Sequence, residues 1–314
     1  MVIMKKYCSL IIDIKQSRAY NLRDRNELQE YMAQCITLLN SLFKKNLVFD
    51  VTFSAGDELQ GLFSNTVAAV RYLRLLSILA NPVQLRAGIG IGEWNVRMEG
   101  GLSTEQDGPV YHNARSAIDE VYRMQTQRFR ICSGSRKDVL GNYLLNASMQ
   151  FCLHQNITQS QVLFLLEVMY PFVEETSDFN NRKELIDLAV TKSSFSIGKR
   201  TKKQAQEKKE QESKKDQETK EKQEKQEDQG KQNDRENQGL NIASLTVVEN
   251  IYITGTLEET ENTVIRKNMS SNIAEVIGTT RQNVDKIMKR GNAIFIRNMD
   301  YMALQYIQKT YREG

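Results

Sequence analysis

The chain has 314 residues, of which 26% are charged and 40% are apolar, and its formal net charge is +4. This length suits one large domain or two ordinary ones. No apolar run approaches the roughly 20 residues of a membrane-spanning helix. The apolar run after Lys6 ends at Asp13 and lacks the small-residue cleavage site of a signal peptide. We therefore expect a cytoplasmic protein with no membrane segment.

The cysteines and histidines exclude several common kinds of site. Cys8, Cys35, Cys132 and Cys152 lie far apart and form no Cys-x-x-Cys motif. They are expected to be reduced thiols of the core rather than zinc ligands. Two histidines in the whole chain also leave little room for a His-rich metal site or a Ser-His-Asp triad.

The first part of the sequence alternates between strand-like and helix-like patterns. Expected strands are residues 7–12, 47–53, 58–63 and 83–91, and expected helices are residues 25–44 and 65–80. The two middle strands flank turn-forming residues and predict a β-hairpin with Gly56 and Asp57 at its tip. The resulting order, βαββαβ, predicts an α+β fold of the ferredoxin-like type.

Three carboxylates occupy related places in this predicted fold. Asp13 ends the first strand, and Asp57 and Glu58 stand at the hairpin tip. The first and third strands of a ferredoxin-like sheet are neighbours, so these side chains are expected to meet at one edge. Like charges in contact are unfavourable unless they share a cation, and oxygen ligands suit Mg²⁺ or Mn²⁺. Each aspartate alone could equally be an ordinary cap or turn residue, and only the combination predicts a metal site.

Several motifs follow one another as in class III nucleotidyl cyclases. They are Asp13-Ile14, Gly56-Asp57-Glu58, the glycine-rich residues 85–92 and the residues 107–115. The Gly-Asp-Glu tip also looks like that of diguanylate cyclases and polymerase palms. The segments IIDIKQSR, FSAGDELQGLF, RAGIGIGE and DGPVYHNARSAI together resemble the bacterial SatD family, over about residues 5–135 and again in the C-terminal piece.

This resemblance implies a palm fold that binds a nucleoside triphosphate with two divalent cations. It implies Asp13, the Ile14 carbonyl and Asp57 as metal ligands, with Glu58 beside them, and it implies a homodimer. Cyclases of this class carry an asparagine and an arginine four residues apart on the next helix. Arg115 matches the arginine, whereas Tyr111 stands at the asparagine position. A tyrosine hydroxyl could bind the sugar, but the exchange puts cyclisation in doubt.

Other residues near these motifs are candidates for contact with the nucleotide or for structural roles. Gly56 and Arg18 are candidates for contact with the nucleotide, and Arg18, Arg23 and Arg25 either reach its phosphates or are surface charges. Gly88, Gly90 and Gly92 lack the helix context of a dinucleotide fingerprint and are expected to allow close backbone packing. Glu93, directly after them, is a further candidate ligand.

Residues 199–238 differ from everything around them. Of these 40 residues, 24 are charged, 13 positive and 11 negative, and Ala205 is the single apolar residue. Such a segment cannot bury a core of its own and is expected to be solvated, as a linker or as a helix with Glu/Lys pairs. Without an apolar seam it cannot form a coiled coil. We expect a palm domain over 1–145, a helical segment over 146–198, the charged stretch over 199–239 and a helix-turn-helix domain over 240–314.

Helix-like stretches at 158–173 and 182–192 are expected to form a small packing unit or a binding groove. If the C-terminal domain needs one of these helices, the charged stretch is an insertion rather than a linker. Residues 245–256 fit either a helix or a strand.

Residues 270–291 carry a helix-turn-helix pattern. Ala274 stands where two helices would cross, Gly278 permits the turn, and Thr279 or Thr280 caps the second helix. Its outer side then presents residue types that contact DNA: Thr280, Arg281, Gln282, Asn283, Lys286, Lys289 and Arg290. Residues 266–312 hold nine basic and three acidic residues, a local charge of +6. This pattern predicts DNA binding, although helix-turn-helix pairs also serve as protein contacts.

Three hypotheses follow. In the first, a cyclase-like palm binds a nucleoside triphosphate through Mg²⁺ or Mn²⁺ and is joined to a DNA-binding helix-turn-helix, with or without turnover. In the second, the chain is a transcriptional regulator whose palm is a structural or dimerising module. In the third, it is a protein-interaction module with an inert palm.

Overall fold

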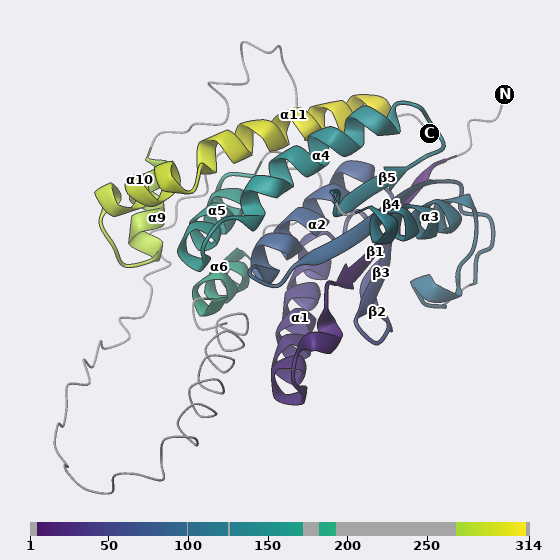
Figure 1. Cartoon of the computed structure of the whole chain (residues 1–314), viewed down its shortest axis with the longest axis horizontal. Coiled ribbons are helices and arrows are strands. Elements are labelled where there is room, and N and C mark those ends of the chain that lie inside the picture. Colours follow the sequence, from purple (N-terminus) through teal and green to yellow (C-terminus); the bar gives the residue numbers. More distant parts are fainter. Residues whose placement is uncertain (1–4, 99, 125, 172–181, 193–267, 312–314) are drawn as a thin grey trace, which may run out of the picture.

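The computed structural model describes residues 5–98, 100–124, 126–171, 182–192 and 268–311 (Figure 1). Its centre is a five-stranded sheet in the order β2-β3-β1-β4-β5. The strands are β1 (Tyr7–Ile14), β2 (Leu47–Ala55), β3 (Glu58–Phe63), β4 (Leu85–Gly92) and β5 (Phe129–Cys132). The helices are α1 (Leu22–Leu42), α2 (Thr66–Ala80), α3 (Pro109–Arg123), α4 (Asp138–Leu153), α5 (Ile157–Met169), α6 (Arg182–Thr191), α9 (Met269–Val276), α10 (Arg281–Arg290) and α11 (Ala293–Tyr311), with short 3₁₀ turns η1 (Ser17–Ala19) and η2 (Ser103–Glu105).

The sheet is mixed, with β1 at its centre. β1 is antiparallel to both β3 and β4, whereas β5 runs parallel to β4. The four strands and two helices expected in the first part of the chain are all present near their predicted residues. The first and third strands are indeed adjacent. β5 joins through the α3 crossover and was not expected.

The alternation of side chains along β1 gives the sheet two distinct faces. Cys8, Leu10 and Ile12 point into the main core beneath α1 and α2. Ile11 packs on the other face against Ala114 and Ile118 of α3. Because strand neighbours point to opposite faces, Asp13 shares the α3 side with Ile11.

The glycines of β4 let α3 lie directly on the sheet. A Cβ added at Gly88 would lie 2.5 Å from Ile118 N, and one at Gly90 would overlap the backbone of Val110 and Ala114. The expectation of close backbone packing at these glycines is therefore confirmed. This contact fixes the position of every side chain that α3 presents to the sheet.

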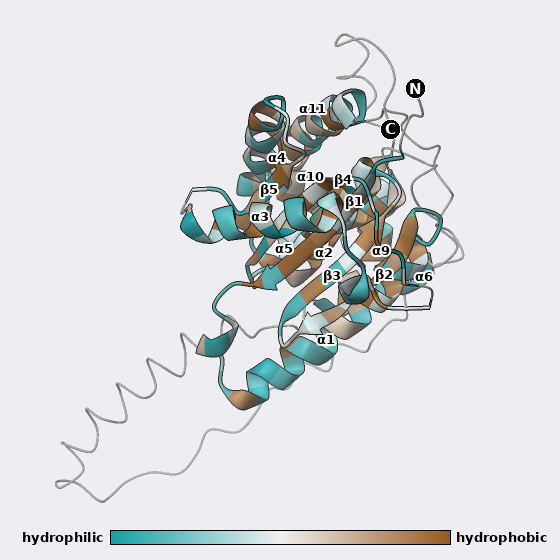
Figure 2. Cartoon of the chain, turned by 90° about the vertical axis from the view of Figure 1, so that its right-hand side faces the viewer, coloured by the Kyte–Doolittle hydropathy of each residue, from teal (hydrophilic) through white to brown (hydrophobic). Residues whose placement is uncertain are grey.

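Helix α2 is buried along its whole length, including the polar side chains of Arg71, Arg74 and Ser77. The sheet covers one side of it, and α5 and α11 cover the other. A helix with no solvent face is typical of the centre of a multilayered protein. In Figure 2 the hydrophobic segments accordingly gather between the sheet and the helices.

The C-terminal helices are packed onto the first part of the chain. α11 lies along α4 (Figure 1), and α9 and α10 contact α5. Gln155 donates a 2.6 Å hydrogen bond to the Gly291 carbonyl, and Asn272 donates one of 2.8 Å to the Tyr170 hydroxyl. The described parts before and after the charged stretch therefore share one helical layer.

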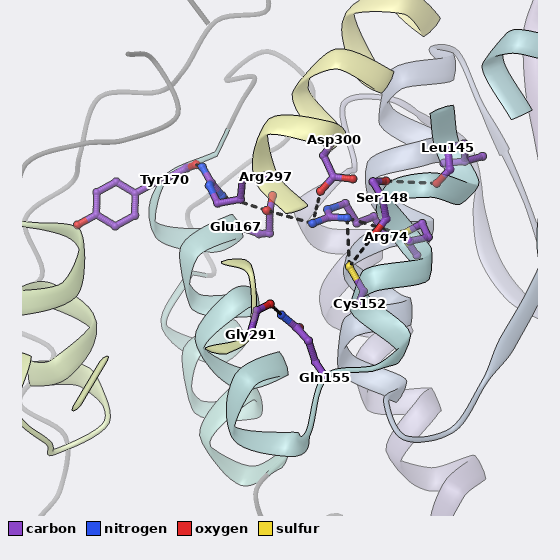
Figure 3. A network of polar contacts seen from close by, with 11 residues as sticks. Arg74, Leu145, Ser148, Cys152, Gln155, Glu167, Tyr170, Gly291, Arg297 and Asp300 are labelled. Carbon is purple, nitrogen blue, oxygen red and sulfur yellow. Dashed lines mark hydrogen bonds and ion pairs between the residues drawn. The ribbon is translucent and has the colours of Figure 1, made fainter. Parts of the chain in front are cut away.

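A buried ionic cluster joins three helices in this layer (Figure 3). Arg74 of α2 pairs with Asp300 of α11 and, at 3.4 Å, with Glu167 of α5. Arg297 of α11 pairs with Glu167 at 3.0 Å and donates a 2.7 Å hydrogen bond to the Tyr170 carbonyl. All four side chains are at most 4% exposed.

The expected domain boundaries can be compared with the structure only in part. The boundary expected at residue 145 falls inside α4, which Asn142 and Asn146 tie to β5 through side-chain hydrogen bonds. The charged stretch 199–239 and the element expected at 245–256 lie outside the described residues.

All four cysteines are free, and Cys132 is only half-buried. No described helix combines the length and hydrophobicity that crossing a bilayer requires.

Candidate functional site

Asp13 lies at the end of β1 beside Arg86, its register partner on β4. Both Nε and Nη2 of Arg86 donate to Asp13 Oδ2, at 3.0 and 2.6 Å. The Asp13 side chain is 14% exposed. Burial raises the pKa of Asp13, the contact with Arg86 opposes this rise, and the negative charges of Asp57 and Glu58 add to it. Ile12 is the register partner of Leu59 on β3, so Asp13 lies at the same end of the paired strands as Glu58 and the hairpin tip with Asp57.

Glu58 begins β3 and is held by Arg115 of α3. Arg115 Nη1 and Nη2 donate to the two Glu58 carboxylate oxygens at 2.8 and 2.9 Å, a bidentate pair. Ser54 Oγ donates to Glu58 Oε1 at 3.0 Å. The hydrogen bonds to Glu58 raise the pKa of Arg115 further above its usual value. Arg115 is half exposed and Glu58 is 16% exposed.

Asp57 stands at the hairpin tip, as expected. β2 ends at Ala55 and β3 begins at Glu58, so Gly56 and Asp57 form a two-residue loop. Gly56 has a φ of 65°, a conformation that favours glycine at the first position of a hairpin turn. Gly56 and Asp57 border a small cleft whose other walls are Ile14, Ser17, Arg25, Leu28, Gln29 and Phe53.

Tyr122 of α3 completes the arrangement. The Arg86 guanidinium lies 4.5 Å from the centre of the Tyr122 ring, within the range of a cation–π interaction. Burial raises the pKa of Tyr122, and the negative charge of Asp13 adds to the rise. Arg86 thus contacts a carboxylate on one strand and an aromatic ring on the helix above it.

These residues form a polar edge of mixed charge, which we call the palm edge: Asp13, Asp57, Glu58, Arg86, Arg115 and Tyr122. Carboxylate oxygens suit a hard divalent cation, and guanidinium groups suit phosphate. Within the described residues no three Asp, Glu, His or Cys side chains are arranged as a ready metal cage. Arginine contacts occupy Asp13 and Glu58 instead, so the donors have the right chemistry but are paired internally.

A second polar surface lies on α10. Its amino end is capped by Thr280, whose side chain accepts a hydrogen bond from Asn283 N at 3.2 Å. The turn before it contains Gly278, with a φ of 65°. Val284 is buried, whereas the residues expected to face DNA are all exposed: Thr280, Arg281, Gln282, Asn283, Lys286, Lys289 and Arg290. Arg281 approaches Asp285 at 3.7 Å.

The SatD family model matches residues 7–216, about two thirds of the chain. The chain belongs to the SatD family. The match includes the whole palm edge and helices α1 to α6, and it ends before the C-terminal helices. The family resemblance expected over residues 5–135 is thus extended towards the C-terminus, while the C-terminal piece lies outside the match.

Comparison with solved structures gives one weak similarity for this SatD protein. A bacterial light-regulated adenylyl cyclase aligns with a TM-score of 0.30 and 13% identity, over 40% of this chain and 74% of the cyclase chain. No curated protein matches the sequence.

The structure places three further expected residues of the SatD protein as follows. Tyr111 is buried with Tyr7 and Leu62, and burial raises its pKa to about 12, so its hydroxyl is not offered to a ribose at the surface. Glu93 follows the carboxyl end of β4, whereas Asp13 pairs with Arg86 near the amino end of that strand, so the two carboxylates lie at opposite ends of β4. Arg18 is exposed in η1, and Arg25 rather than Arg18 lines the cleft with Asp57.

Arg86 and Tyr122 were missed from the sequence. Arg86 precedes Gly88 and Gly90 at alternating positions of β4, which indicates that it shares the α3 face with them. Its contact with Asp13 also depends on the antiparallel register of β1 and β4. That register cannot be read from a single strand.

Proposed function

We propose that the protein is a nucleotide-responsive DNA-binding protein whose ferredoxin-like, cyclase-type palm binds a nucleoside triphosphate with Mg²⁺ or Mn²⁺ at the palm edge. The observation that carries this proposal is that Asp13, Asp57 and Glu58 stand at one end of the paired strands β1 and β3, with Arg86 bound to Asp13 and Arg115 bound to Glu58. Carboxylates for cations and guanidiniums for phosphates are the two donor types that a metal-bound triphosphate needs.

The residues present fit a divalent cation in donor chemistry. Asp13, Asp57 and the Ile14 carbonyl would hold it, with Glu58 as a further oxygen donor. Bound there, the cation would neutralise charge on the triphosphate. The palm residues would do the rest: Arg115 and Arg86 would bind phosphate oxygens, and the Gly56 turn would let the backbone approach them.

The same geometry favours sensing over cyclisation. Cyclisation requires a group that positions the ribose near the α-phosphate, and the residue at the matching position is the buried Tyr111. Its ring packs with Tyr7 and Leu62, and its buried hydroxyl lies beside Ser103. We therefore place the role of the palm in nucleotide binding, and a cyclic product would identify the chain as an enzyme instead.

A specific observation favours DNA as the second partner. The exposed face of α10 carries four cations and two amides, and it is the second helix of a pair joined by the Gly278 turn. Helix-turn-helix proteins place such a helix in the major groove. Since α9 and α10 contact α5, we also infer that residues 199–239 are an insertion within one helical unit rather than a linker between two domains.

Equilibrium dialysis tests the nucleotide proposal directly. The full chain is dialysed against each nucleoside triphosphate with Mn²⁺, and the products are separated by chromatography. Asp13→Asn and Asp57→Asn are expected to weaken binding of at least one nucleotide by tenfold or more. Asp50→Asn, which alters an exposed carboxylate of the same hairpin, is the matched control and should bind normally. Unchanged binding in both palm-edge variants refutes the proposal.

A further inference from the structure

The Arg86 guanidinium is the cationic group in contact with Asp13. Two of its nitrogens donate to a single carboxylate oxygen, at 3.0 and 2.6 Å. The pair is mostly sheltered, with 26% of Arg86 and 14% of Asp13 exposed. A charged group in this position lowers the affinity of Asp13 for any other cation, both by contact and by repulsion.

The guanidinium also has a second support that does not depend on Asp13. It lies 4.5 Å from the centre of the Tyr122 ring. Cation–π contacts tolerate movement of the cation over the ring face. Arg86 therefore has a contact with α3 that does not involve Asp13, and its guanidinium fork is suited to phosphate.

We propose that Arg86 is a built-in counter-cation that keeps Asp13 closed to a bare divalent ion and releases it when a triphosphate arrives with the metal. This inference rests on the proposed function and specifies how the site is regulated. In the resting protein Arg86 neutralises Asp13, and in the bound state Arg86 neutralises phosphate.

This transfer of Arg86 from Asp13 to phosphate predicts opposite effects of a single substitution on two affinities. Removing the charge of Arg86 removes a competitor of the bare metal and, at the same time, a ligand of the phosphates. Arg86→Gln is therefore expected to bind Mn²⁺ alone more tightly and the Mn²⁺–tripolyphosphate complex more weakly. An arginine that only supports the fold, with no electrostatic effect on either probe, would change both affinities in the same direction or neither.

Titration of the full chain with Mn²⁺, followed by the electron paramagnetic resonance signal of the free ion, measures the first affinity. Calorimetry with Mn²⁺–tripolyphosphate measures the second. For Arg86→Gln we expect Mn²⁺ binding to be tighter by up to about fivefold, the fold-change that corresponds to a surface ion pair of about 1 kcal/mol, and binding of the complex to be weaker. Arg86→Lys keeps the charge and should bind bare Mn²⁺ about as weakly as the natural protein.

Arg130→Gln is the matched control. Arg130 lies on the neighbouring strand β5, pairs with Glu120 and is 25% exposed, close to the value for Arg86. Its substitution should leave both affinities unchanged. Thermal unfolding of each variant confirms that it is folded.

The outcomes separate this inference from the proposed function. If the natural protein binds the complex but Arg86→Gln binds bare Mn²⁺ no more tightly, the exchange role of Arg86 is refuted and nucleotide binding stands. If no variant binds either probe, the proposed function is refuted and the inference with it. Tighter Mn²⁺ binding combined with weaker binding of the complex supports both.

Discussion

Arg74 of α2 forms a buried ion pair with Asp300 of α11, and through it the C-terminal helices are anchored to the helix beneath the central sheet. Both side chains are 4% exposed, and Glu167 and Arg297 complete the cluster around them. α2 in turn contacts β1 and β4, which carry Asp13 and Arg86. A short chain of packed elements therefore connects the palm edge to the helical unit that carries α10.

Replacing Arg74 with methionine should strongly destabilise the protein. The substitution leaves Asp300 without its main partner and removes one partner of Glu167, both in the interior. Breaking one side of a buried pair typically costs about 3–5 kcal/mol. Urea unfolding of Arg74→Met measures the loss. The double variant Arg74→Met/Asp300→Leu should recover part of it, and strictly additive losses would show that the two residues do not interact.

The stability of the protein should depend on Asp300 between about pH 4 and pH 7. Burial raises the pKa of Asp300 to about 7, and Arg74 opposes that rise. An aspartate in an unfolded chain titrates near 3.9. Between these values the folded state binds more protons than the unfolded state, so stability falls as pH rises, by up to about 1.4 kcal/mol per pH unit.

Unfolding free energies measured from pH 4 to pH 8 test this dependence. Asp300→Asn cannot ionise, so its profile should be flatter across the window, whatever its absolute stability. Among the neighbours, burial raises the pKa of Glu167, but Arg297 and Arg74 outweigh it and the net pKa is lowered. An unchanged slope in the variant would assign the effect to another group.

Gly88→Ala should displace α3 from the sheet. The new methyl group would lie 2.5 Å from Ile118 N, and overpacking of this kind costs about 1–3 kcal/mol. Because α3 carries Arg115 and Tyr122, binding of the Mn²⁺–nucleotide complex should weaken as well. Thermal unfolding and calorimetry measure the two effects, and a variant as stable as the natural protein would show that α3 is free to move.

Duplex DNA binding should depend on the exposed cations of α10. Arg281→Ala and Lys286→Ala should each weaken binding of a fluorescent duplex, and each should reduce the slope of log affinity against log salt by about 1 if the side chain contacts a phosphate. Lys309→Ala, an exposed cation near the end of α11, is the control. Equal affinities for all four proteins would exclude α10 as the DNA surface.

The elements that periodicity defines were predictable, and the contacts between distant elements were not. The spacing of Val67, Val70 and Leu73 predicts α2 correctly. The same pattern makes Arg74 look like part of a solvent face, because its partners Glu167 and Asp300 come from helices far along the chain.

In the candidate site, too, the positions set by local elements were predictable and the contacts between distant elements were not. The places of Asp13, Asp57 and Glu58 follow from strand ends and from one turn, so their convergence could be predicted. The contacts of Arg86 and Arg115 could not, because they depend on strand register and on how closely α3 approaches the glycines of β4.

The most direct measurement is a crystal structure of the full chain with Mn²⁺ and a non-hydrolysable nucleoside triphosphate, with the anomalous signal of manganese used to locate the ion. We expect manganese between Asp13 and Asp57, with Arg86 moved from Asp13 to a phosphate oxygen. Nucleotide bound elsewhere, or a palm edge with Arg86 still on Asp13 and no manganese at saturating concentrations, would contradict it.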